Sequence, residues 1–107
     1  MMRVIHFFDL NPGVDKRQVF KEFEIVEEYL KSNGCIERRT MRLLDASSKG
    51  GEPIASAEYI NENLWSGKEA AETAFQEMPP DVRQHVKEFL SKIAMEKSVR
   101  YVDDGVL

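Results

Sequence analysis

The sequence predicts a single α+β domain whose four strands and three helices follow the order β-α-β-β-(α-α)-β. Two observations lead to this prediction. Short runs rich in β-branched and aromatic residues alternate with segments whose apolar residues recur every three or four positions. Turn-forming glycine, proline and asparagine residues separate these segments. The chain has 107 residues without an internal repeat or linker, so residues 1–107 are expected to share one core.

The first strand and the first helix have clear boundaries in the sequence. Residues 4–10, VIHFFDL, have strand character, and the Asn-Pro-Gly turn at residues 11–13 ends the strand because proline fixes φ and glycine accepts positive φ. Asp15 followed by Gln18 resembles a capping box, and the Asn-Gly pair at residues 33–34 is a helix stop. The helix between them presents one apolar face, formed by Val19, Phe23, Val26 and Leu30.

Two further strands are expected in the middle of the chain. Residues 35–45 return to strand character, and residues 54–60 form the third strand, with Glu58 inside it. The Ser-, Gly- and Pro-rich residues 46–53 connect these strands as an open hairpin loop. Cys35 is the only cysteine, and it is expected to be a small buried hydrophobe.

The next segment is helical in two parts. Residues 66–69, SGKE, form a second capping box before an apolar stripe that ends at Met78. Pro79-Pro80 breaks this helix because neither residue donates a backbone N–H. A new helix follows, with a buried face at Val82, Val86, Phe89, Leu90 and Ile93. Residues 98–102 form the last strand and residues 103–107 a tail.

This order is the ferredoxin-like split βαβ arrangement, in which helices cover one face of a four-stranded antiparallel sheet. Strand side chains alternate between the two faces. We assign the more uniformly apolar set to the helices; it comprises Ile5, Phe7, Cys35, Met41, Leu43, Ala55, Ala57 and Tyr59. The opposite face then carries Val4, His6, Phe8, Arg38, Thr40, Arg42, Leu44, Ile54, Ser56 and Glu58.

The mixed character of that opposite face predicts a homodimer. The face is too apolar to be left in water and too polar for an ordinary core. Two copies that close around it, sheet against sheet, bury its apolar members and enclose a partly polar cavity for a small organic ligand. The sequence therefore predicts a homodimeric barrel with its binding site on the sheet side.

The layout resembles the dimeric α+β barrel superfamily and is closest to its stress-responsive A/B barrel proteins. The local likeness lies in VIHFFDLNPGVDKRQVFKEF, a histidine-bearing strand, a Pro-Gly turn and an amphipathic helix, followed by NGCIE. The superfamily also includes small cofactor-free monooxygenases. The resemblance implies a homodimer without a cofactor, and it implies that a histidine of the first strand, here His6, points into the barrel.

His6 and Glu58 are the candidate catalytic residues. Imidazole titrates near neutral pH without perturbation, so His6 is either a general base or ligand-orienting group, or a structural histidine bonded to Glu58 or a carbonyl. Glu58 either has a raised pKa within an apolar strand or pairs with Arg38, Arg42 or a residue of the partner chain. Side-chain alternation and strand adjacency predict that His6 and Glu58 are polar neighbours on the cavity face.

The candidate ligand contacts are Arg38, Arg42, Phe8, Ser56 and Trp65. The two arginines either hold a carboxylate or phosphate by bidentate contacts or form a solvated strand edge. Trp65 either stacks on a ligand or packs in the hydrophobic core just before the next helix begins. His85 is expected on a helix flank, and no metal site is expected, because the sequence lacks a histidine spacing typical of metal ligands.

Composition argues against several classes of function. The net charge is -4 with a pI near 5.2, and acidic and basic residues are interleaved, which argues against nucleic-acid binding. No run is long and apolar enough to span a bilayer, and the start lacks a signal peptide, so a cytoplasmic protein is expected. The favoured function is binding of a small organic ligand, and the alternative is a cofactor-independent monooxygenase or isomerase that uses His6.

Overall fold

The computed structural model describes residues 1–103 and 105. Its elements are β1 (Met2–Leu10), α1 (Lys16–Ser32), β2 (Glu37–Arg42), β3 (Tyr59–Trp65), α2 (Lys68–Gln76), α3 (Pro80–Ser91) and β4 (Ile93–Val102). The predicted order of four strands and three helices is confirmed. Of the tail predicted at residues 103–107, residues 104, 106 and 107 lie outside the described residues.

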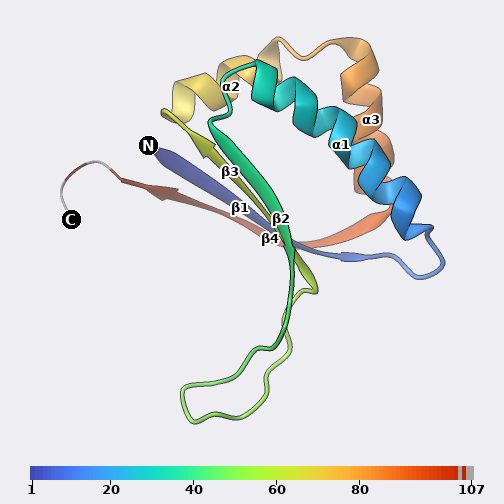
Figure 1. Cartoon of the computed structure of the whole chain (residues 1–107), viewed down its shortest axis with the longest axis vertical. Helices are drawn as coiled ribbons and strands as arrows, with labels where there is room; N and C mark the ends of the chain where they lie inside the picture. Colours follow the sequence, from blue (N-terminus) through green and yellow to red (C-terminus); the bar gives the residue numbers. More distant parts are fainter. Residues whose placement is uncertain (104, 106–107) are drawn as a thin grey trace.

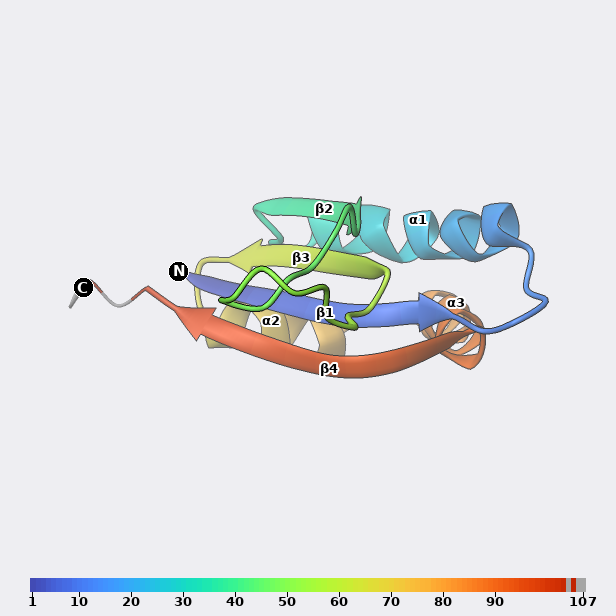
Figure 2. The ribbon, with the colours of Figure 1, turned by 90° about the horizontal axis from the view of Figure 1, so that it is seen from below.

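The sheet has the strand order β2-β3-β1-β4, and each neighbouring pair is antiparallel. Among the described residues, helices α1, α2 and α3 lie on one face of the sheet, and no helix of this part of the chain covers the opposite face (Figure 1). Seen from below, the four strands lie side by side with the helices behind them (Figure 2). This is the predicted ferredoxin-like α+β fold. Within the described residues, no helix is long and apolar enough to cross a membrane.

The helix boundaries follow local chemistry. Asp15 caps α1, because its Oδ1 accepts a hydrogen bond from the backbone N–H of Arg17 at 3.0 Å. Gly34, with a φ of +104°, follows α1 in the left-handed region that glycine favours. Pro80 begins α3, as the Pro-Pro break predicts. The predicted capping box of α2 is wrong, because the N-cap is Gly67 and no side chain caps the helix.

The third strand lies further along the chain than predicted. The sequence pattern places it at residues 54–60, but it runs over Tyr59–Trp65 and includes an Asn-Glu-Asn run at residues 61–63 that disfavours strands by propensity. Residues 43–58 instead form an arm that projects from the sheet (Figure 1). β2 is therefore shorter than predicted, and β4 begins at Ile93, directly after α3.

The core lies between the sheet and the helices in two clusters. The first surrounds Trp65, which is 1% exposed, and includes Met2, Val26, Leu30, Cys35, Ala71, Ala74, Met78 and Val82. The second comprises Phe8, Val19, Tyr59, Phe89 and Ile93. Phe8 stacks on Tyr59 with ring centroids 5.5 Å apart. Cys35 is buried as predicted, and burial raises the pKa of its thiol.

The predicted face assignment of β1 is wrong. Phe8 packs with Val19 of α1 and Phe89 of α3, so Phe8 faces the helices. His6 belongs to the same alternating set and lies on the same face. The alternate positions, Ile5 and Phe7, therefore lie on the uncovered face.

The same correction applies to β2. Arg38 forms an ion pair with Glu27 of α1, and Thr40 Oγ1 lies 3.5 Å from the same carboxylate. Both side chains therefore face the helices. The prediction failed because it assumed a uniformly apolar helix-covered face, whereas this face carries polar side chains that satisfy one another.

Candidate functional site

A cavity of about 190 Å³ lies between the helix-covered face of the sheet and the helices. Its roof comes from Phe23, Val26 and Leu30 of α1 and from Val86, Phe89 and Leu90 of α3. Its floor comes from His6, Phe8, Asn61, Asn63 and Met95 of the sheet, and Phe75 of α2 also lines it. The cavity is partly open to solvent, because Phe75, Leu90 and Met95 are 45%, 49% and 41% exposed. A mostly apolar hollow with a few placed polar groups is the usual form of a small-molecule site.

A row of polar side chains crosses the sheet beneath this cavity. Thr40 of β2 lies opposite Asn61 of β3, which lies opposite His6 of β1. His6 in turn lies opposite Ser98 of β4. His6 Nδ1 and Ser98 Oγ are hydrogen-bonded at 2.6 Å. Burial lowers the pKa of His6 below its ordinary 6.5, so the imidazole is neutral at pH 7.

Arg38 fixes the two asparagines of the cavity floor. Its side chain is 7% exposed, pairs with Glu27, and donates from Nε to Asn63 Oδ1 at 3.0 Å. Because a guanidinium only donates hydrogen bonds, this contact turns the amide NH₂ of Asn63 toward Asn61. Asn63 Nδ2 then donates to Asn61 Oδ1 at 3.3 Å, and Asn61 Nδ2 donates to Thr40 Oγ1 at 3.1 Å. The network holds the floor in one arrangement.

One N–H of Asn63 is left over for a ligand. The amide NH₂ offers two donors, and among the residues that the structure describes one acceptor is in place, Asn61 Oδ1. Asn63 is 4% exposed and lines the cavity. Asn63 also lines the groove that leads to solvent, so this N–H can donate either to water or to an oxygen atom of a ligand.

A wider groove of about 460 Å³ continues from the cavity along β1 and α2. The cavity and the groove share His6, Asn63 and Phe75. Two cationic side chains, Lys68 and Arg100, line the groove. Lys68 Nζ lies 3.6 Å from Glu72 Oε1, one turn further along α2. The groove is therefore more polar than the cavity and gives it an opening to solvent.

The residues predicted for the site lie in two separate places. His6 and Phe8 line the cavity, and Arg38 supports its floor. Arg42, Ser56 and Glu58 line a different hollow together with Phe7. Trp65 is buried in the core and borders the groove. The cavity therefore lies under the helices, whereas the prediction placed it on the opposite side of the sheet.

The predicted contact between His6 and Glu58 is wrong. β3 begins at Tyr59, so Glu58 precedes the strand, and His6 lies opposite Asn61. The backbone N–H of Glu58 instead donates to Asp9 Oδ1 at 2.7 Å. The prediction failed because the third strand lies further along the chain than expected, and this changes which β3 residue lies opposite each residue of β1.

The sequence reasoning missed Asn61 and Asn63. Their spacing carries a signal, because residues at i and i+2 of a strand share a face. Trp65 continues the same set, and a tryptophan of that set is expected to point into the core. Reading 61–65 as a strand with an inward tryptophan would have placed both asparagines in the interior.

Comparison with known proteins finds structural likeness at low sequence identity. No protein-family profile and no curated protein sequence matches the chain. SnoaB from Streptomyces nogalater, described as a cofactor-independent oxygenase, has a TM-score of 0.71 and 12% identity over 99% of this chain and 95% of SnoaB. The Arabidopsis thaliana protein At3g17210 has a TM-score of 0.68 and 13% identity over 99% of this chain and 97% of that protein.

A third similar structure belongs to a Chloroflexus aurantiacus protein provisionally designated an antibiotic biosynthesis monooxygenase. Its TM-score is 0.61 at 17% identity, over 97% of this chain and 93% of that protein. At these identities the likeness establishes the fold alone. The chain has the ferredoxin-like α+β fold of these proteins, and the predicted resemblance to the α+β barrel superfamily is confirmed at the level of the fold.

Proposed function

We propose that this protein binds a small, largely apolar organic ligand in the cavity between the sheet and helices α1 and α3. The observation that carries the proposal is the combination of an apolar roof with a fixed polar floor, in which Asn63 retains a free N–H. The cavity volume of about 190 Å³ is comparable with the roughly 150 Å³ of an apolar cavity that binds benzene. A ligand of one or two rings with one hydrogen-bonding oxygen fits this description.

The charge distribution favours a ligand whose buried part is neutral. His6 is neutral because burial lowers its pKa. The positive charge of Arg38 is already matched by Glu27. The interior therefore offers hydrogen bonds without net charge, and an ionised ligand group would remain in the groove near Arg100.

Filling the cavity tests the proposal. In Val86→Trp, the indole is expected to occupy the space beneath α3 and to abolish binding of naphthol measured by calorimetric titration. Lys87→Trp places the same side chain on the exposed neighbouring position, and it should bind naphthol like the wild type. Equal binding by the wild type and a folded Val86→Trp variant, or no binding by either, would contradict the proposal.

A pH dependence is expected from His6. The folded state holds its pKa below the ordinary 6.5, so between these two values the unfolded chain binds more protons. The contribution of His6 to the free energy of unfolding is therefore complete above pH 6.5, its ordinary pKa, and falls as the pH drops below that value. His6→Gln keeps a hydrogen-bonding group and removes this titration, so its free energy of unfolding should fall less steeply toward acid pH in urea titrations. Parallel pH profiles for the two proteins would contradict this expectation.

We also propose that two copies of the chain associate through the uncovered face. Its middle carries the half-buried apolar side chains Ile5, Phe7, Ile60 and Leu64. Glu62 lies among them and is neutralised by Arg39 at 2.8 Å and Arg3 at 3.4 Å. An apolar patch whose central carboxylate is already paired is suited to a self-complementary two-fold interface.

Placing a charge on this face is expected to separate the copies. The wild type should show twice the 12.3 kDa chain mass by light scattering after size exclusion, and Ile60→Lys should show the single mass, because an unpaired ammonium is costly to bury. Ile25→Lys, on the solvent side of α1 and 39% exposed, should remain at the double mass. A wild type of single mass, or a folded Ile60→Lys variant of double mass, would exclude this interface.

Cofactor-independent oxygenation is a second candidate function. It is favoured by a neutral imidazole beside an apolar cavity, because His6 in this state can accept a proton from a phenolic ligand while Asn63 donates to the resulting oxyanion. SnoaB, of the same fold, is described as such an enzyme. Oxygen uptake with a naphthalenediol should exceed the rate in buffer and fall to that rate in His6→Gln. If the wild type takes up oxygen no faster than buffer does, oxygenation is excluded and ligand binding remains as the proposed function.

A further inference from the structure

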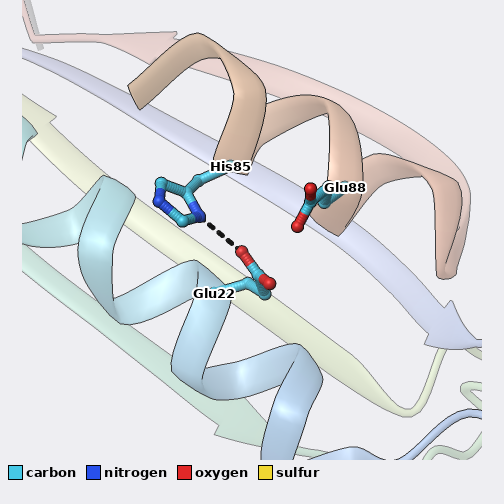
Figure 3. A group of neighbouring side chains, drawn as sticks. All are labelled: Glu22, His85 and Glu88. Atoms are coloured by element: carbon cyan, nitrogen blue, oxygen red, sulfur yellow. Dashed lines mark hydrogen bonds and ion pairs between the residues drawn. The ribbon is translucent and has the colours of Figure 1, made fainter. Parts of the chain in front are cut away.

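We propose that Glu22, His85 and Glu88 form a binding site for one divalent first-row transition-metal ion between α1 and α3. One ligand-type atom of each residue lies within 4.8 Å of the other two. Figure 3 shows the three side chains converging from the two helices, Glu22 from α1 and the other two from α3. His85 Nδ1 and Glu22 Oε2 are 2.5 Å apart. This site is separate from the cavity and does not depend on its function.

The helical spacing brings the three groups together. Residues three positions apart lie on the same face of a helix, so His85 and Glu88 point in one direction from α3. Glu22 meets them from α1, although it is far away in sequence. It is 7% exposed. Glutamate is almost never buried this deeply without a partner of opposite charge.

The charge of the cluster favours a cation. Two carboxylates face a single imidazole, so the cluster is negative even when His85 is protonated. Among residues 1–103, no lysine or arginine forms an ion pair with Glu22 or Glu88. The remaining contacts are neutral amides: Gln18 Nε2 donates to Glu22 Oε1 at 3.1 Å, and Gln84 Nε2 donates to Glu88 Oε1 at 3.4 Å. Such amides orient metal ligands without neutralising them.

The donor set indicates the class of metal. One imidazole nitrogen with two carboxylate oxygens suits Zn²⁺, Co²⁺ or Mn²⁺, whereas Mg²⁺ and Ca²⁺ prefer oxygen ligands throughout. The side chain of His85 is 33% exposed, so water can reach the site and complete the coordination shell. An ion here would tie α1 to α3 next to the roof of the cavity, where Phe23 and Phe89 stack with centroids 4.4 Å apart.

Titration of the untagged protein with zinc chloride tests the site. Calorimetry should show one ion bound per chain and no comparable heat with magnesium chloride, and Co²⁺ should give a visible absorption band that Zn²⁺ displaces. Glu88→Gln removes one ligand and leaves the contact between Glu22 and His85. It should weaken Zn²⁺ binding by about tenfold or more, since the loss of even an outer-shell partner costs this much.

Two matched variants separate this site from other parts of the chain. Glu24→Gln neutralises an exposed carboxylate of α1, and His6→Gln removes the other histidine; both should bind Zn²⁺ like the wild type. At one Zn²⁺ concentration, the unfolding temperature should rise in the wild type and in these two variants by clearly more than in Glu88→Gln. The proposal is overturned if the wild type does not bind Zn²⁺, if Glu88→Gln binds it equally well, or if His6→Gln loses it.

Discussion

Replacing Phe8 with alanine is expected to lower the free energy of unfolding by about 3–5 kcal/mol, the range for truncating a buried phenylalanine. Phe8 is 1% exposed. Its ring stacks on Tyr59 at 5.5 Å and meets the edge of Phe89 at 5.7 Å, measured between ring centroids. The cost combines the lost transfer of the ring out of water with a void that the surrounding rings fill only in part. Urea unfolding, followed by the fluorescence of Trp65, measures this loss in the free energy of unfolding.

Phe7→Ala is the matched control, because Phe7 is the next residue of the same strand and lies on the uncovered face. It is half-buried in the single chain and packs near Ile60 of the neighbouring strand. Its replacement should cost clearly less than Phe8→Ala in the unfolding of the chain, and it should weaken association of two copies. A larger loss of stability for Phe7→Ala than for Phe8→Ala in the monomeric Ile60→Lys background would reverse the assignment of the two faces.

Replacing Arg38 with methionine is expected to destabilise the fold by about 2–4 kcal/mol. Breaking a buried ion pair on one side costs about 3–5 kcal/mol because the other charge is left unpaired. Glu27 is 25% exposed, so solvent reduces that cost. Asn63 also loses the donor that fixes its amide, so binding of naphthol should weaken in the same variant.

Two comparisons identify the unpaired charge as the cause. Adding Glu27→Gln to Arg38→Met should recover part of the lost stability, because no carboxylate then remains without its partner. Arg39→Met removes the next arginine, whose side chain is 53% exposed and whose partner Glu62 keeps Arg3 at 3.4 Å; in the monomeric Ile60→Lys background it should cost only about 0–1 kcal/mol. Equal losses for Arg38→Met and Arg39→Met in urea titrations would show that the buried network adds nothing to stability.

The order of elements was predictable because its signals are local. The cap at Asp15, the glycine at position 34 and the Pro79-Pro80 break each act within a few residues, and each marks a helix boundary in the structure. The third strand was not predictable from propensity. Its Asn-Glu-Asn run at 61–63 is stabilised in the strand by side chains of β2, which reach it only when the two strands pair.

The candidate site was predictable only in part for the same reason. The sequence identifies His6 as an unusual residue in a strand, but the register of β3 decides whether it meets Glu58 or Asn61. Asn63 becomes a fixed donor through Arg38, which is distant in sequence. The contact between Glu22 and His85 spans 63 positions. Pairings of this kind depend on tertiary structure, and a single sequence does not specify them.

A ¹H–¹⁵N NMR titration of the wild type with naphthol locates the ligand on the molecule. We expect the largest shifts on the side-chain amides of Asn61 and Asn63 and on the backbone of Phe8 and Val86, all of which line the cavity. Val86→Trp should abolish these shifts. The absence of any shift, or shifts confined to the uncovered face around Ile60, would contradict a binding site between the sheet and the helices.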